Sequence, residues 1–260
     1  MKLIDSHCHI LDPRLADQAD EIVANLGADG LECIIEISAC VNESKESLAF
    51  AQKHEKVFCT IGVHPHVIHE YDDEFERWAL AQVSNKKIVG FGECGLDYCE
   101  KFMPNSKELQ KQIFTRQIIL ADKMKLPLVV HERESFEDTM QVLIENKKHI
   151  NHGLLLHCFS ECEVEVKRVR EHFDAYFAFG GAITFKNNKV SNSAIKAIPL
   201  DRILVETDSP YLSPEPFRGK LNQPKNVRII AEFIAGVLDM PLEKIAKVTT
   251  QNTKRFFGIN

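Results

Sequence analysis

Short apolar runs alternate along the chain with longer amphipathic stretches, which is the pattern of a repeated strand and helix. Eight of the apolar runs predict strands. They cover residues 2–9, 31–37, 57–63, 88–93, 128–131, 153–157, 175–179 and 203–208. Because eight parallel strands with intervening helices can close on themselves, the pattern predicts the α/β class and a (β/α)8 TIM barrel.

The segments between the strands carry helix signals. Asp12 followed by Pro13 predicts a helix that begins there and ends near Gly27. Asn105 and Glu108 resemble a capping pair at the start of a long helix, which should end before a proline at position 127. Beyond the eighth strand we expect an irregular loop over 214–220 and two final helices over 224–238 and 242–256.

The chain has 260 residues, of which 44% are hydrophobic, enough for one large core. With no Pro/Gly/Ser-rich linker to divide it, we expect a single domain over residues 1–260. The net charge of −6 argues against a wide face for binding duplex nucleic acid. It leaves room for a local basic rim around an acidic pocket.

The first residues lack the charged, apolar and small-residue regions of a secretion signal, and no apolar run approaches the roughly 18 residues of a membrane span. We therefore expect a soluble, cytoplasmic protein. Its eight cysteines form no C-x-x-C pair, so reduced thiols are expected rather than disulfides or a zinc finger. The oligomeric state is left open, and a monomer is compatible with the sequence.

Two histidines, His7 and His9, stand one residue apart at the end of the first predicted strand. Side chains two residues apart on a strand project to the same side, so both imidazoles can bind one metal ion. Histidines on strands are more often packed or solvated than metallated. The interpretation therefore depends on whether other ligands occur at matching places.

Further metal-binding residue types stand at the carboxyl ends of four other predicted strands, where barrel enzymes assemble their active sites. Each alone has an ordinary structural explanation, such as a helix cap, a loop residue or a packed core histidine. The coincidence of all of them favours a metal centre. These residues are Glu93, His131, His157 and Asp208.

Six ligands exceed what one tetrahedral ion with an open position takes, which is about three protein ligands. Two ions that share a carboxylate fit better. We expect the first ion to be bound by His7, His9 and Asp208, the second by His131 and His157, with Glu93 bridging. Two ions about 3.5 to 4 Å apart can hold a water between them and generate hydroxide near neutral pH, which is the nucleophile of a hydrolase.

Strand alternation also predicts the roles of neighbouring residues. Cys8, Cys94 and Cys158 each adjoin a predicted ligand and should point away from it, into the helix layer. Asp5 and Glu206, two positions before ligands, should share the ligands' face. They are candidates for orienting an imidazole or the water, although each can also be a buried, satisfied acid.

Several motifs together resemble the TatD family of metal-dependent deoxyribonucleases, which lies within the amidohydrolase-like superfamily. In chain order they are His7-Cys-His9, Gly62-Val-His-Pro-His66, Gly92-Glu-Cys-Gly-Leu-Asp-Tyr98, His157-Cys-Phe-Ser160 and Glu206-Thr-Asp-Ser-Pro-Tyr-Leu212. The resemblance covers essentially the whole chain. It implies a barrel with a two-metal site that hydrolyses DNA from the 3′ end, and it places the same six residues at the ligand positions.

Three residues gain a role only from this resemblance. His64 matches a residue that faces the substrate near the metals, and His66 is a second candidate for substrate binding. Arg218 resembles a basic residue of the loop after the eighth strand, where a guanidinium can clamp a phosphate through two hydrogen bonds. Without the motif, Arg218 is equally well explained as a solvated loop residue.

The leading hypothesis is a phosphodiesterase acting on single-stranded DNA ends. A metal-bridged hydroxide would attack phosphorus in line. Asp208 and Glu93 are predicted catalytic residues, and Asp208 would orient or deprotonate the water. His64 or a metal-bound water would protonate the leaving oxygen. The cations expected to guide the strand are Lys186, Lys189, Arg218 and Lys220.

Two alternatives remain at this point. The first is another binuclear hydrolase acting on a cyclic amide, a lactone, a deaminase substrate or a phosphotriester. Such sites often use a carboxylated lysine as the bridge, so Glu93 favours the nuclease. The second is a barrel that binds metal or nucleic acid without turnover, which the complete ligand set argues against.

The sequence does not determine which metal ion is bound, and Mg, Mn, Zn, Co, Fe and Ni are all compatible with the ligands. It also leaves undetermined the strand polarity of digestion and the choice between DNA and RNA.

Overall fold

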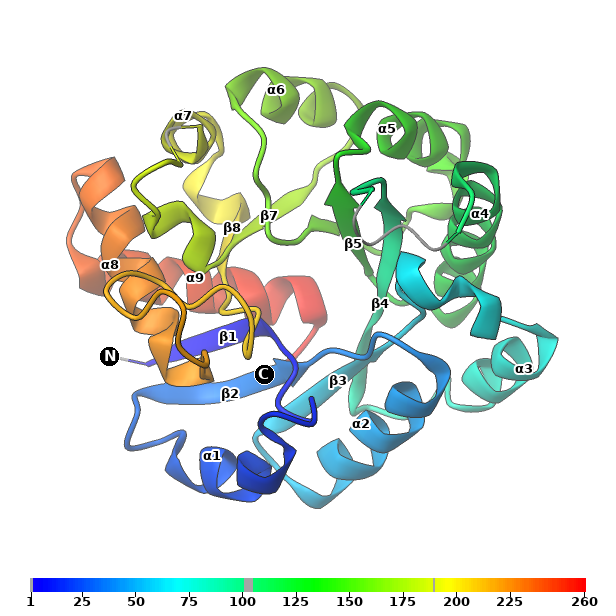
Figure 1. The fold of residues 1–260 in the computed structure, drawn as a ribbon, viewed down its shortest axis with the longest axis horizontal. Coiled ribbons are helices and arrows are strands. Elements are labelled where there is room, and N and C mark those ends of the chain that lie inside the picture. Colours follow the sequence, from blue (N-terminus) through cyan, green and yellow to red (C-terminus); the bar gives the residue numbers. More distant parts are fainter. Residues whose placement is uncertain (1, 101–104, 189) are drawn as a thin grey trace.

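A computed structural model of the protein describes residues 2–100, 105–188 and 190–260. Its eight strands form one sheet in the order β1 to β8, and every neighbouring pair is parallel (Figure 1). The strands are β1 (Leu3–Cys8), β2 (Leu31–Glu36), β3 (Val57–Ile61), β4 (Ile88–Asp97), β5 (Leu128–Arg133), β6 (Leu154–Leu156), β7 (Tyr176–Phe179) and β8 (Ile203–Val205). The predicted (β/α)8 TIM barrel is confirmed.

The barrel closes between β8 and β1 through contacts at their carboxyl ends. Cys8 and Ser209 form an isolated parallel bridge. The N–H of Asp208 donates to the carbonyl of His7 at 2.9 Å, and the N–H of His9 donates to the carbonyl of Ser209 at 2.7 Å. The residues that follow β8 are therefore held directly against the end of β1, where the His-x-His pair lies.

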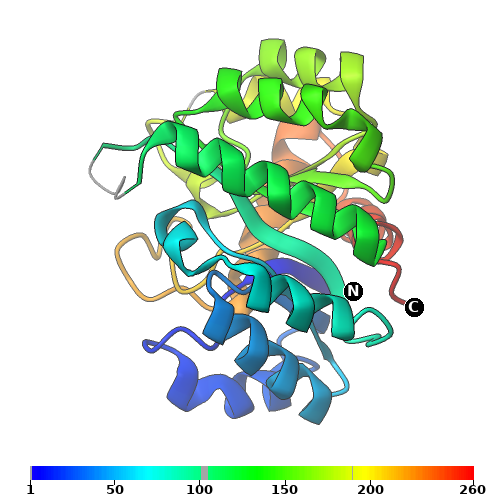
Figure 2. The same ribbon diagram turned by 90° about the vertical axis from the view of Figure 1, so that its right-hand side faces the viewer.

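Helices surround the barrel, and Figure 2 shows both termini at one end with the loop after β8 at the other. They are α1 (Ala19–Asn25), α2 (Val41–Lys53), α3 (Asp73–Ala81), α4 (Lys107–Met124), α5 (Phe136–Glu145), α6 (Glu163–His172), α7 (Ser191–Ala197), α8 (Val227–Leu238) and α9 (Leu242–Phe257). Short 3-10 turns cover Ala16–Gln18, Pro65–Glu70, Lys147–His149, Gly181–Thr184, Leu200–Arg202 and Pro224–Asn226. Within the described ranges, none of the helices has the length and apolar character needed to cross a bilayer.

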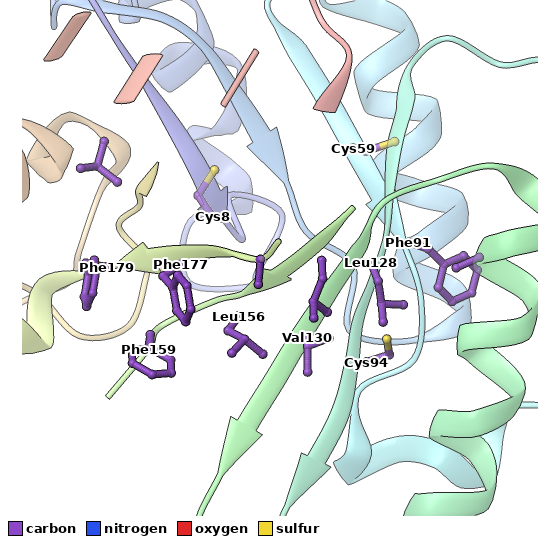
Figure 3. Close-up of a cluster of buried hydrophobic side chains, with 14 of the residues drawn as sticks. Cys8, Cys59, Phe91, Cys94, Leu128, Val130, Leu156, Phe159, Phe177 and Phe179 are labelled. Atoms are coloured by element: carbon purple, nitrogen blue, oxygen red, sulfur yellow. The ribbon is translucent and has the colours of Figure 1, made fainter. Parts of the chain in front are cut away.

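The buried apolar residues form two clusters because side chains alternate along each strand. Val129 belongs to a small cluster inside the barrel, where Phe256 and Phe257 of α9 close the amino-terminal end. Its neighbour Val130 belongs to the large cluster between barrel and helices (Figure 3). Other members of the outer cluster labelled there are Cys8, Cys59, Phe91, Cys94, Leu128, Leu156, Phe159, Phe177 and Phe179.

The ends of several elements differ from the sequence prediction; β8, for example, ends at Val205, so Asp208 lies in the segment after the strand rather than at its last position. The first α-helix begins at Ala19, because Asp12 instead accepts hydrogen bonds from Arg14 within a turn. The long helix α4 is capped by the hydroxyl of Ser106, not by Asn105, whose amide donates to backbone carbonyls of the loop after β3. Strand β4 continues four residues beyond the predicted end at Glu93.

Candidate metal centre

Four donor atoms from distant parts of the sequence converge at the carboxyl end of the barrel. The Nε2 atoms of His7 and His9 are 3.2 Å apart. Oε2 of Glu93 lies 3.5 Å and 3.7 Å from them, and Oδ1 of Asp208 lies 3.7 Å and 3.5 Å from them, respectively. The separations just given are those expected of ligands that each lie about 2.0 to 2.2 Å from one tetrahedral ion. We call these four residues the first donor cluster, and they can hold one metal ion.

A second donor cluster lies on the other side of Glu93. Its Oε1 atom is 2.7 Å from Nδ1 of His131 and 2.8 Å from Nε2 of His157, and these two ring nitrogens are 3.4 Å apart. The two oxygens of Glu93 thus face different clusters. Nitrogen and carboxylate donors of this kind suit Zn and other first-row divalent metals, so the donor chemistry of both clusters fits divalent ions.

Backbone contacts hold His9 of the first cluster. Nδ1 of His9 lies 3.0 Å from the carbonyl of Ile37, which directs Nε2 toward the cluster. The buried carboxyl group of Glu36 accepts the backbone N–H groups of Ile10 and Leu11 and so holds the chain just after His9. Burial raises the pKa of Glu36 to about 8, even though these hydrogen bonds and the charge on His9 oppose the shift.

Asp97 is a site residue that the sequence interpretation missed. Its Oδ2 atom lies 3.0 Å from Nε2 of His131 and 2.9 Å from Nε2 of His66. Burial alone would raise the pKa of Asp97, but the hydrogen bonds from these two rings hold it below its usual value. The carboxylate therefore directs Nδ1 of His131 toward Glu93. The sequence pattern that could have identified Asp97 is its spacing of four residues from Glu93, because this spacing places both side chains on one face of a continuing strand.

His64 and His66 occupy different positions in the site. Nε2 of His64 lies 3.7 Å from Oε1 of Glu93, and its Nδ1 accepts the backbone N–H of His66 at 3.2 Å. Since Nδ1 is the acceptor, the proton of a neutral His64 lies on Nε2, facing the second cluster. Burial, followed by the charge on His131, lowers the pKa of His64 well below its usual value, which favours this neutral form. The ring of His66 is directed to Asp97.

Glu206 lies beneath both clusters. Its Oε1 atom accepts the backbone N–H of Cys158 at 2.6 Å and lies 3.5 Å from Nδ1 of His157. Donor atoms of His7, His157 and Glu206 all lie within 4.8 Å of one another. Among the residues that the structure describes, the buried Nδ1 atoms of both histidines and Oε2 of Glu206 have no hydrogen-bond partner. Glu206 is thus placed to orient the ring of His157 and lies close to that of His7.

Asp5, the other acid predicted to face the ligands, accepts hydrogen bonds from the backbone N–H and hydroxyl of Thr207 at 2.9 and 2.5 Å. It also accepts the backbone N–H of His7 at 3.3 Å. These bonds connect the end of β1 to the segment after β8, and none of them involves an imidazole. Asp5 therefore supports the backbone that carries His7 and Asp208.

Of the three cysteines beside ligands, Cys8 and Cys94 belong to the outer cluster, as predicted. Cys158 differs. Strand β6 ends at Leu156, and Cys158 has a positive φ of 45° and is only half-buried. Strand alternation does not continue to Cys158, so it does not pack in the helix layer.

The predicted substrate-binding cations lie farther out. Arg218 is exposed, and its guanidinium carbon lies 4.2 Å from the ring centroid of Phe185 rather than against the donor clusters. Lys186 and Lys220 are exposed, and Lys189 lies outside the described residues. The two loops that carry these side chains thus meet where Arg218 packs on Phe185.

A parallel barrel with histidines and carboxylates gathered at its carboxyl end is the architecture of a metal-dependent hydrolase. A model of the family described as TatD related DNase matches residues 4–258. The chain therefore belongs to the TatD-related DNase family of metal-dependent hydrolases.

Named relatives and solved structures agree with this assignment. "Uncharacterized metal-dependent hydrolase YabD" of Bacillus subtilis is 35% identical over 258 residues, 99% of this chain and 100% of the relative. "Uncharacterized metal-dependent hydrolase YcfH" of Escherichia coli K12 is 35% identical over 264 residues, 100% and 97% of the two chains. The crystal structure of YJJV, a TatD homologue from Escherichia coli K12, has a TM-score of 0.89 at 23% identity, with coverage of 99% of this chain and 98% of that chain. This last similarity establishes the fold.

Proposed function

We propose that this protein hydrolyses phosphodiester bonds of DNA, as a 3′ to 5′ exonuclease on single-stranded ends, with two divalent metal ions. The observation that carries the proposal is the placement of Glu93, whose two carboxylate oxygens face two separate donor clusters. The family model, described as TatD related DNase, supports a DNA substrate.

Six residues would hold the two ions. His7, His9 and Asp208 would bind the first, His131 and His157 the second, and Glu93 would bridge them. Divalent ions at such positions lower the pKa of a water and neutralise charge on phosphoryl oxygens. This chemistry suits attack on a phosphodiester, which carries a negative charge before and throughout the reaction.

Asp208 is the proposed acceptor of the nucleophile's proton. Burial alone would raise its pKa, but the hydrogen bond from His9 and the charges on His7 and His9 lower it, so Asp208 is a carboxylate at neutral pH. His64 is the proposed donor on the opposite side of Glu93, because its Nε2 proton faces the second cluster. In this neutral form it can donate a hydrogen bond to a phosphoryl oxygen or to the leaving oxygen, whereas proton transfer to the leaving oxygen would require the imidazolium form.

The proposed preference for single-stranded ends rests on the net charge of the protein and on the flexibility of a single-stranded end. A net charge of −6 disfavours a broad duplex-binding face, whereas a flexible end can be led to a buried metal site. The exposed side chains of Lys186, Arg218 and Lys220 are the proposed cations of the rim.

The decisive experiment is a time course on single-stranded and duplex DNA and RNA labelled at either end, with Mg, Mn, Zn, Co, Fe and Ni in turn. We expect stepwise shortening of single-stranded DNA from the 3′ end, and loss of this activity in Glu93→Gln. DNA left intact with every metal, together with turnover of dihydroorotate or a simple lactone, would instead identify another binuclear hydrolase. If the wild-type protein and Glu93→Gln hydrolyse DNA at the same rate, the proposed metal centre is overturned.

A further inference from the structure

Two loops at the carboxyl end of the barrel are joined by a compact group of Asp12, Arg14 and Tyr211. Asp12 and Arg14 belong to the loop after β1, and Tyr211 belongs to the loop after β8, which is orange in Figure 1. The carboxylate of Asp12 accepts two hydrogen bonds from the guanidinium of Arg14, both at 2.8 Å. It also accepts the hydroxyl of Tyr211 at 3.1 Å.

The same group presents flat, accessible surfaces. The guanidinium carbon of Arg14 lies 4.3 Å from the centroid of the Tyr211 ring, so Arg14 covers part of that ring. Tyr211 is nevertheless 44% exposed, and the side chain of Arg14 is 47% exposed. Tyr211 therefore keeps accessible ring surface although Asp12 and Arg14 fix its orientation.

The position of Tyr211 connects it to the donor clusters. Its ring packs edge to face against His9, with centroids 5.9 Å apart and planes at 87°. Glu36 holds the backbone of Ile10 and Leu11 between His9 and Asp12. Tyr211 is therefore held immediately beside the first donor cluster, with little freedom to move away.

The ionisation states are consistent with a preformed surface. The Arg14 hydrogen bond is the main cause that lowers the pKa of Asp12 to about 2. Burial, aided by Asp12, raises the pKa of Tyr211 to about 12. At neutral pH, Asp12 is therefore an acceptor and the hydroxyl of Tyr211 a donor, as the contact requires.

We propose that Tyr211, backed by Arg14, is a stacking platform for the nucleobase next to the phosphate that is cleaved. This proposal rests on the proposed function and adds to it a subsite for the base. Stacking on an aromatic ring accepts every base, because each has a π-face, so the platform would secure a single-stranded end without reading its sequence. A paired base, already stacked in a duplex, would reach it less readily.

The test compares a single-stranded oligonucleotide with one whose last two nucleotides lack bases. For the wild-type enzyme we expect kcat/KM to fall roughly 5- to 150-fold on the abasic end, which is the range for loss of one stacked base. Tyr211→Ala should lower kcat/KM by a similar factor on the normal end and hardly at all on the abasic end. Tyr211→Phe and Tyr211→Trp should keep the preference for the base.

Phe217→Ala is the matched control, because Phe217 is an exposed aromatic residue of the same loop, at 39% exposure, and should leave the preference unchanged. The platform is overturned if Tyr211→Ala lowers activity equally on both ends, since Tyr211 would then only fasten the two loops. It is also overturned if Tyr211→Phe behaves like Tyr211→Ala, since the hydroxyl bonded to Asp12, and not the ring, would then be the group that matters. If the wild-type enzyme cleaves no DNA with any metal, the proposed function itself fails and the platform fails with it. Melting temperatures of all variants exclude unfolding as the cause.

Discussion

His7 and His157 stack face to face, with ring centroids 3.9 Å apart and planes only 8° from parallel. Yet their Nε2 atoms belong to different donor clusters on either side of Glu93. Two imidazolium rings in this arrangement would repel each other. Burial and then the neighbouring His157 lower the pKa of His7, so the stack favours a neutral His7, which is the form that a metal ion requires.

Glu206→Gln tests whether one carboxylate orients both stacked rings. The amide removes the negative charge beneath Nδ1 of His157 and near His7. Because carboxylates that orient metal-binding histidines contribute to affinity, we expect metal binding to weaken about 10- to 100-fold. Isothermal titration calorimetry with Zn or Mn measures the effect. Unchanged affinity would assign Glu206 only to the backbone of Cys158.

Glu93→Asp tests the bridge itself. Aspartate keeps the charge but is one methylene shorter, so its two oxygens cannot reach both clusters in the same way. We expect the metal content to fall from two ions per chain to one, and turnover to fall by about 100-fold or more because the reacting groups are displaced. Metal analysis of the dialysed protein, together with the DNA assay, measures both. Two ions in Glu93→Asp would contradict the bridging role.

Asp97→Asn tests the acid that holds His131. Loss of the carboxylate should weaken metal binding at the second cluster by about 10- to 100-fold, since it fixes the orientation of that imidazole. Asp122→Asn is the matched control. Asp122 also contacts a histidine, His149, at 2.9 Å, but on the surface away from the donor clusters. Equal effects of the two substitutions would show that Asp97 has no special role.

Metal binding should strengthen as pH rises. Although burial opposes it, the hydrogen bond to Asp208 and the charges on Glu93 and Asp208 raise the pKa of His9 to about 9 in the metal-free protein. His9 is therefore protonated at pH 7, and an ion must displace that proton. We expect proton release on metal binding and an affinity that increases up to about pH 9. Calorimetry in buffers of different ionisation enthalpy measures the released proton, and a pH-independent affinity would argue against His9 as a ligand.

Removal of the metal should abolish hydrolysis and lower thermal stability. A ligand present at about 100 times its dissociation constant stabilises a fold by about 2.7 kcal/mol, equivalent here to a change in Tm of about 5 to 10 °C. Thermal unfolding before and after chelation, followed by readdition of metal, measures this difference. The Glu93→Gln variant provides the control, since its Tm should respond much less to the chelator.

Much of this protein can be predicted from local sequence patterns. Strand periodicity identified all eight strands and put His7 and His9 on one side of β1, because both follow from the geometry of a single strand. The carboxyl-end rule for parallel barrels then related Glu93, His131 and Asp208, which are far apart in the sequence. Turn geometry was predicted less well, and the first helix begins at Ala19 because side chains of Asp12 and Arg14 satisfy the preceding turn.

The sequence by itself determined the barrel and the residue types at its carboxyl end, since strand alternation and parallel pairing depend only on local periodicity and chain order. Only the tertiary structure decided which atoms face one another. It directed the two oxygens of Glu93 to different clusters, placed Asp97 behind His131 and set Tyr211 beside His9. The physical reason is that rotamers, register shifts and loop paths depend on contacts between distant segments, and no local pattern encodes those contacts.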